Sequence, residues 1–234
     1  RLEIDHYIHW MDNPIAHVVT GKDYLNPKIK ILVDEAIDLE SKEKLSSYLK
    51  KWLYTLIKKE LSDLVNLSNT KSHNNYERAL CFQLFENNGV IKREKANQII
   101  KNISKESRVE LRKIGVKIGR YHIFLFKLLK PEAVSLRILL WKNYNQKFFN
   151  LKPPTFGLNF LENKDLKNKN FMLLCGFESF DEYFVRIDIL ERLFVKIINS
   201  NPNKNSKIKL VPEMLNLLGC SKENFLKLIK KMNY

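Results

Sequence analysis

The stretch GVKIGRYHIFLF, residues 115–126, interrupts a long helical pattern and decides the class of the fold. It crowds β-branched and aromatic residues around Gly119, whereas the apolar residues on either side recur at helical spacing. The stretch therefore predicts a strand or a pair of strands over 116–126. Pro131 fits the first position of a following helix, because proline there loses no intrahelical hydrogen bond.

Residues before this stretch predict a mainly helical region. Apolar residues recur every three to five positions over 41–66, with Ser41 as the expected N-cap. Such a helix would be about 39 Å long at 1.5 Å per residue. The polar stretch 67–75 is the expected hinge. The same pattern predicts further helices over 76–88, 93–103, 105–114 and from Pro131 to Tyr144.

The two ends of the chain predict short strands. Apolar or alternating runs separated by turn residues indicate strands at 4–10, 15–19 and 29–33. Pro153-Pro154 marks a boundary, and no internal repeat is found in the sequence. Beyond the boundary we expect a loop over 159–170, strands at 171–175 and 183–187, a helix beginning with an Asp188/Glu191 capping box, and closing helices at 212–218 and 222–232.

These elements predict a mainly α fold with small β elements, of the α+β class. We expect short N-terminal strands, a central helical bundle and a small α/β C-terminal part. The corresponding regions are a short-strand element over 1–40, a helical region with a strand pair near 116–126 over 41–150, and a small α/β region ending in a helical pair over 151–234.

The composition is that of a folded protein of a reducing compartment. The chain has 234 residues, of which 44% are hydrophobic and 29% charged, enough apolar material for a core. Its three cysteines lie far apart with no Cys-x-x-Cys spacing, which favours the cytoplasm. No run is long and apolar enough to predict a membrane span or a signal peptide. Because the sequence begins with Arg1, we expect it to be a fragment of a longer protein.

The positive charge is concentrated in the middle of the chain. Residues 67–150 carry 17 Lys/Arg against 6 Asp/Glu, whereas 1–66 carry 10 against 11 and 151–234 carry 14 against 9. A local excess of this size favours a polyanionic partner, nucleic acid before an acidic membrane. Compositional drift toward Lys, Asn and Ile is the alternative, but it does not explain a local shortage of acidic residues.

The best candidate contact surface lies within 108–147, where basic residues alternate with aromatic ones. Basic side chains contact phosphates, and exposed aromatic rings stack on unpaired bases. Phe124 and Trp141 are expected in the core because of their apolar neighbours, while Tyr121-His122 fits a surface strip or a half-buried pair. The predicted nucleic-acid-binding residues are Arg108, Arg112, Lys113, Lys117, Arg120, Tyr121, His122, Lys127, Lys130 and Arg137.

Searches for catalytic motifs are negative. The sequence has no Gly-x-x-x-x-Gly-Lys-Ser/Thr phosphate loop, no zinc-ligand spacing and no motif around a Ser or Cys nucleophile. Asp34 with Glu40 and Lys42 gives only a loose version of a nuclease site, at a helix start. We therefore expect no catalytic site, metal or cofactor in this chain. The closing helices have helix-turn-helix spacing, but the second one lacks residues that read base edges, apart from Asn224.

Several blocks resemble the region after the motor domains in alphaproteobacterial superfamily-two helicases related to the mitochondrial degradosome RNA helicase. The resemblance covers nearly the whole chain and rests on ordered blocks, not on a catalytic signature. Residues 10–34 are similar to the part just after the motor, and Phe126-Lys127 departs from the pattern where a proline is expected. The other blocks are YERALCFQLFENNG (76–89), LRKIGVKIGRYHIFL (111–125), LLKP (128–131), LRILLW (136–141) and EMLNLLGCS (213–221).

The resemblance implies a parent ATP-dependent helicase whose two RecA-like motor domains, with their ATP and Mg²⁺, lie outside this chain. We expect the chain to contact single-stranded RNA or DNA and its own motor domains, without a membrane partner. The alternative is a protein-interaction or scaffold region whose basic face docks the motor or another protein. The resemblance assigns no catalytic residue within this chain.

Overall fold

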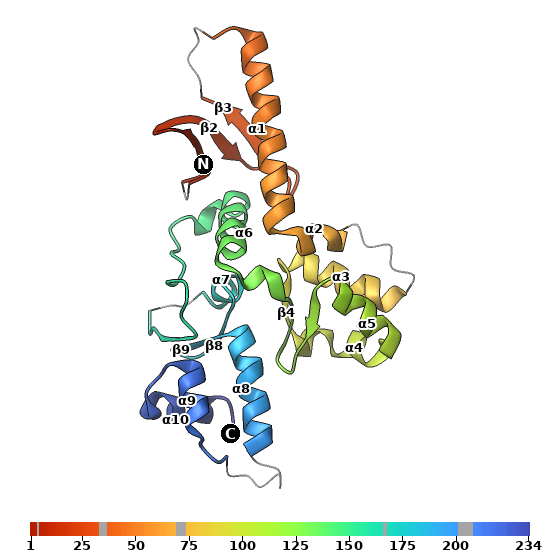
Figure 1. Cartoon of the computed structure of the whole chain (residues 1–234), viewed down its shortest axis with the longest axis vertical. Coiled ribbons are helices and arrows are strands. Elements are labelled where there is room, and N and C mark those ends of the chain that lie inside the picture. The colour runs from red at the N-terminus through yellow and green to blue at the C-terminus, as the bar shows by residue number, and fades with distance from the viewer. Residues whose placement is uncertain (4, 33–36, 69–73, 166–167, 201–207) are drawn as a thin grey trace.

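The computed structural model describes residues 1–3, 5–32, 37–68, 74–165, 168–200 and 208–234. This part of the chain forms ten α-helices and three three-stranded antiparallel sheets, so the mainly α class with small β elements is confirmed. The molecule is elongated (Figure 1). One sheet lies near the N-terminus, one near the C-terminus, and one in a lobe at the side of the molecule, residues 75–125, which we call the lateral lobe. No helix among the described residues combines the length and hydrophobicity needed to cross a bilayer.

The first sheet packs against the longest helix. Strands β1 (Tyr7–Trp10), β2 (Asn13–Val19) and β3 (Lys28–Ile31) pair in sequence order, close to the predicted strands, and Ala16 and Val18 of β2 are buried. The helix predicted over 41–66 is two helices, α1 (Leu39–Glu60) and α2 (Ser62–Ser68). The N-cap is Asp38, whose carboxylate accepts the backbone N–H of Ser41, so the prediction of Ser41 as the cap was wrong.

The lateral lobe contains the predicted strand pair. Strands β5 (Val116–Ile118) and β6 (His122–Leu125) form a hairpin, and β6 also pairs with β4 (Val90–Lys92), which the sequence analysis missed. Strand β4 has only three residues, too few to show the alternation of apolar and polar residues that predicts a strand. The apolar residues after it recur at helical spacing. The remaining elements of the lobe are α3 (Asn75–Glu86), the 3-10 helix η1 (Arg93–Ala96), α4 (Asn97–Asn102) and α5 (Lys105–Lys113).

Helix α6 (Pro131–Tyr144) lies at the centre and begins at the predicted proline. It follows the 3-10 helix η2 (Phe126–Leu129) and precedes η3 (Gln146–Phe148). Its hydrophobic residues are buried on more than one side: Leu136 and Leu140 join the core shared with α1 and α3, and Val134 and Ile138 join the core around Phe171. Helix α6 therefore connects the N-terminal and C-terminal parts.

The C-terminal part differs most from the predictions. Residues expected as a strand at 171–175 belong to helix α7 (Lys169–Leu174), and the expected loop contains β7 (Phe160–Glu162). A short apolar run such as Phe171-Met-Leu-Leu fits a buried helix as well as a strand, and packing decided for the helix. The other elements are β8 (Phe177–Phe180), β9 (Tyr183–Arg186), α8 (Ile187–Ser200), α9 (Pro212–Leu218) and α10 (Lys222–Lys231).

A repeat that the sequence analysis did not find is visible in the topology. The hairpins β5–β6 and β8–β9 each follow a helix and a glycine with a left-handed backbone, Gly115 at φ 91° and Gly176 at φ 90°. In both sheets the second strand of the hairpin is central and pairs with an earlier strand, in the orders β4-β6-β5 and β7-β9-β8. The repeat is one of topology, because few identical residues occupy equivalent positions.

Replacing Gly115 with alanine should destabilise the fold by about 3 kcal/mol. The left-handed backbone costs a non-glycine residue about 1–2 kcal/mol, and a Cβ at this position would lie 2.3 Å from Oδ2 of Asp63. Gly157→Ala is the matched control, because Gly157 has the same φ of 91° and a Cβ there would meet no atom within 4 Å. In chemical denaturation, Gly115→Ala should lose clearly more free energy of unfolding than Gly157→Ala. Equal losses would show that Asp63 does not exclude a Cβ at position 115.

Candidate nucleic-acid interface

Four basic side chains converge on one cleft of the lateral lobe. Arg108 and Arg112 come from α5, Lys117 from β5, and Lys127 from η2. The cleft has a volume of about 480 Å³, within the usual range for ligand pockets. We call it the basic cleft; its other lining residues are Asp63, Gly115, Val116, Ile118 and Phe126.

The four basic side chains differ in whether they already have a hydrogen bond or an ion pair within the protein. Arg112 and Lys117 are exposed and have no ion pair within the described residues. Arg108 is half-buried, and its Nη2 donates to the carbonyl of Ile100 at 3.0 Å. Lys127 pairs with Oδ1 of Asp63 at 3.0 Å. Two cations are thus free for an anion, and the other two are held in place beside them.

An exposed aromatic ring lies at the same cleft. Phe126 is 52% exposed. Nζ of Lys117 lies 5.7 Å from the centroid of this ring and 5.9 Å from that of the buried Phe124. A cation and an aromatic surface therefore sit together, as in proteins that bind unpaired nucleotides.

The floor of the cleft holds a buried carboxylate that the sequence analysis missed. Asp63 of α2 is only 5% exposed, and its Oδ2 is buried with no hydrogen-bond partner in the described structure. This oxygen lies directly against Gly115, since a Cβ there would lie 2.3 Å from it. Buried polar atoms are nearly always hydrogen-bonded, so an unpaired acceptor at a cleft can take a donor from a ligand or from water.

The other exposed residues of the predicted set lie outside the cleft. Lys113 pairs with Glu110 at 2.7 Å on α5. The guanidinium of Arg120 lies 5.5 Å from the ring centroid of Phe194 on α8, and Tyr121 shares a hydrogen bond with the hydroxyl of Tyr234 at 2.8 Å. Lys130 is exposed just before α6. None of these residues lines the cleft.

Two residues of the predicted set are buried and cannot contact a nucleic acid in this fold. Arg137 is 0% exposed and donates to the carbonyls of Asn88 at 2.7 Å and Leu128 at 2.8 Å, and burial lowers its pKa to about 10. His122 is also 0% exposed, and its Nε2 lies 2.5 Å from Oε2 of Glu178. Both predictions were wrong because the sequence shows that a side chain is basic but not whether the folded protein buries it against a carbonyl or a carboxylate.

The turn around Arg120 is occupied by a carboxylate of the chain itself. Glu191 accepts the backbone N–H groups of Arg120 at 2.6 Å, Tyr121 at 2.8 Å and His122 at 3.2 Å. The expected capping role of Glu191 at the start of α8 is therefore wrong: the side chain reaches across to the β5–β6 turn. The partner Asp188 of that expected capping box pairs with Arg186 at 2.7 Å.

The closing helical pair is a poorer candidate for nucleic acid. Lys227 of α10 pairs with Glu223, and Lys231 pairs with Asp181 and Glu182, which neutralises much of its positive charge.

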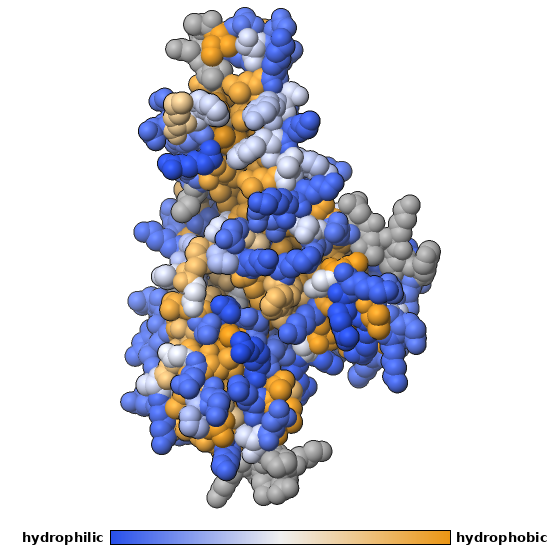
Figure 2. Space-filling model, viewed as in Figure 1, coloured by the Kyte–Doolittle hydropathy of each residue, from blue (hydrophilic) through white to orange (hydrophobic). Residues whose placement is uncertain are grey.

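Figure 2 shows that hydrophilic residues cover most of the lateral lobe on the face in view, whereas hydrophobic residues show along α1 beside the first sheet.

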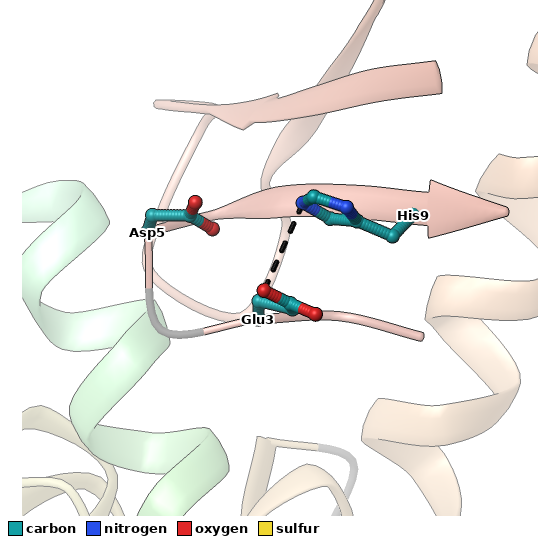
Figure 3. Close-up of side chains that lie close together, drawn as sticks. All are labelled: Glu3, Asp5 and His9. Carbon is teal, nitrogen blue, oxygen red and sulfur yellow. Dashed lines mark ion pairs between the residues drawn. The ribbon is translucent and has the colours of Figure 1, made fainter. Parts of the chain in front are cut away.

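One group among the described residues could hold a metal ion, Glu3, Asp5 and His9 near the N-terminus (Figure 3). Its ligand atoms lie within 4.8 Å of one another, and Nε2 of His9 is 3.8 Å from Oε2 of Glu3. Glu3 also pairs with Arg1, and Oδ1 of Asp5 accepts the N–H of Tyr7. Both carboxylates thus have partners already, and exposed acidic groups of this kind are common without a metal.

Comparison of the chain with protein-family models, with curated proteins and with solved structures finds no match.

The pair formed by Glu178 and His122 should make stability depend on pH. Burial tends to raise the pKa of Glu178, but His122 and Lys92 outweigh it and hold the pKa below the ordinary value. A lowered pKa stabilises the fold above the carboxyl's unfolded value and loses this contribution as pH falls through the folded value. Glu178→Gln should cost about 2 kcal/mol at pH 7, and this difference from wild type should shrink below about pH 4.

Urea denaturation from neutral to acidic pH measures this difference. Glu110→Gln is the control, because Glu110 lies on the surface and its loss should cost less than about 1 kcal/mol. A difference between Glu178→Gln and wild type that is constant over the whole pH range would contradict the assigned role of the carboxylate.

Proposed function

We propose that this chain is the accessory C-terminal region of an ATP-dependent helicase and binds single-stranded nucleic acid through the basic cleft. The observation that carries the proposal is the convergence of Arg108, Arg112, Lys117 and Lys127 beside the exposed ring of Phe126. The cations neutralise phosphates, and the ring stacks on a base. The helicase parent rests on the resemblance of the ordered sequence blocks.

The form of the site favours a single strand over a duplex. A duplex is contacted by elements that project into a groove, whereas the basic side chains here line a hollow between a helix and a strand. A hollow of this size accepts one nucleotide of a flexible strand. The chain supplies binding, and the motor domains of the parent would supply ATP hydrolysis.

Reversing the charge of the two free cations should remove binding. The double variant Arg112→Glu/Lys117→Glu should bind a single-stranded oligonucleotide at least about tenfold more weakly than wild type, because two phosphate contacts become repulsive. The control Lys222→Glu/Lys230→Glu makes the same change in charge at exposed positions of α10 and should bind nearly as wild type. Fluorescence anisotropy measures both, with circular dichroism to check the helical content.

Salt provides a second readout of the same interaction. Wild-type affinity should fall about tenfold between about 50 and about 200 mM salt through counterion release, with a shallower slope for the cleft variant. Absence of binding at low salt, or equal loss in the two double variants, would overturn the assignment of the cleft.

A second candidate function is docking of the motor domains, as in the scaffold alternative. An apolar pocket of about 330 Å³ lies between α1 and α6, formed mainly by Leu56, Leu139 and Phe156. Three acidic residues, Glu3, Glu60 and Glu132, and one basic residue, Lys142, also line it. Apolar walls with an excess of acidic residues suit a protein segment that carries apolar anchors flanked by Lys or Arg.

Filling this pocket should separate docking from nucleic-acid binding. Ser135 is exposed and lines the pocket, so Ser135→Trp fills it without removing a core side chain. If the pocket docks the motor domains, this variant should bind them at least about tenfold more weakly in titration calorimetry, while Ser135→Ala binds as wild type. Unchanged affinity of Ser135→Trp for the motor domains would exclude the pocket as the docking site.

A further inference from the structure

A buried, unpaired acceptor lies beside a donor in the lining of the basic cleft. Oδ2 of Asp63 has no hydrogen-bond partner within the described residues, and its other oxygen holds the ammonium of Lys127 at 3.0 Å. A lysine ammonium has three donors, and the described part of the structure gives Lys127 one partner. A ligand that reaches this place therefore meets an acceptor and a donor side by side.

The adjacent residue supplies a flat surface. Phe126 precedes Lys127 in η2 and is 52% exposed at the same cleft. A base that stacks on this ring would lie at the cleft that Asp63 and Lys127 also line. Oδ2 lies against Gly115, where the Cβ of any other residue would collide with it.

We infer that Asp63 and Lys127 hold an unpaired base by its Watson–Crick edge, so that the cleft selects single strands without reading their sequence. Each of the four bases has an N–H donor next to an acceptor on this edge, which complements the carboxylate and the ammonium. In a duplex the same groups are bonded to the opposite base and do not reach the protein. This inference rests on the proposed function and adds the part of the nucleotide that is recognised.

Contacts of Asp63 and Lys127 with a base account for a preference for single strands over duplexes better than phosphate contacts do. Arginine and lysine contacts to phosphates form with duplexes and single strands alike. An edge contact in a hollow requires a base that has left its partner. The basic residues then supply affinity, and Asp63 with Lys127 supplies the selection.

Two isomeric single strands test this inference. Oligo-thymidine carries its methyl group on C5, away from the Watson–Crick edge, whereas oligo-3-methyldeoxyuridine carries the methyl on N3, where it removes the donor and blocks the edge. Charge, sugar and composition are the same. The full chain should bind the N3-methyl strand about tenfold more weakly than oligo-thymidine in anisotropy titrations at equal salt.

A variant assigns the difference to Asp63. Asp63→Leu has a similar size and removes the acceptor, so it should bind the two strands equally. Glu223→Leu, which removes a carboxylate on the surface of α10, should keep the wild-type ratio. Melting temperatures establish that both variants are folded, and the comparison of the two strands on wild type stands without any variant.

The outcomes separate this inference from the proposed function. If wild type binds both strands equally and with steep salt dependence, the edge contact is overturned while the proposed function stands. If neither strand binds at low salt, the proposed function fails and the edge contact with it. A wild-type ratio that persists in Asp63→Leu overturns the role of Asp63.

Discussion

The carboxylate of Glu191 binds the turn between β5 and β6, and the arrangement of the two halves of the molecule depends on this contact. Three consecutive backbone N–H groups, those of residues 120–122, donate to it at 2.6 to 3.2 Å. Gly119 makes the approach possible, because a Cβ there would lie 2.4 Å from the carboxyl carbon. Without Glu191, backbone donors at this junction would lack a partner, which is costly where water is excluded.

The interactions of Glu178 add to those of Glu191 in fixing the β5–β6 hairpin. Glu178 of β8 lies 2.5 Å from His122 of β6 and 3.1 Å from Lys92 of β4, so polar side chains join these three strands. One end of the β5–β6 hairpin is thereby fixed against the C-terminal part. Its other end, with η2, forms the wall of the basic cleft, where Arg112 and Lys117 have no acidic partner in the described structure.

The candidate site could be predicted only in part from the sequence. The local excess of basic residues directed attention to the segment that contains Arg112, Lys117 and Lys127, which line one cleft, because charge is a property of each residue alone. The same reasoning included Arg137 and His122, whose polar groups are satisfied internally by carbonyls and by Glu178. Burial depends on which distant segments pack together, and no local pattern reports it.

The sequence by itself determined the types of most elements, the glycine and proline positions that end or begin them, and the concentration of positive charge. These follow from backbone sterics and from neighbours within one or two turns. Only the tertiary structure decided that Asp63 would lie in the cleft beside Lys127, which follows it by 64 positions in the sequence. It also decided that Glu191 would bind the β5–β6 turn instead of capping its own helix. Such contacts join residues far apart in sequence, and they exist only because the packing of α2, η2 and α8 brings those side chains within hydrogen-bonding distance.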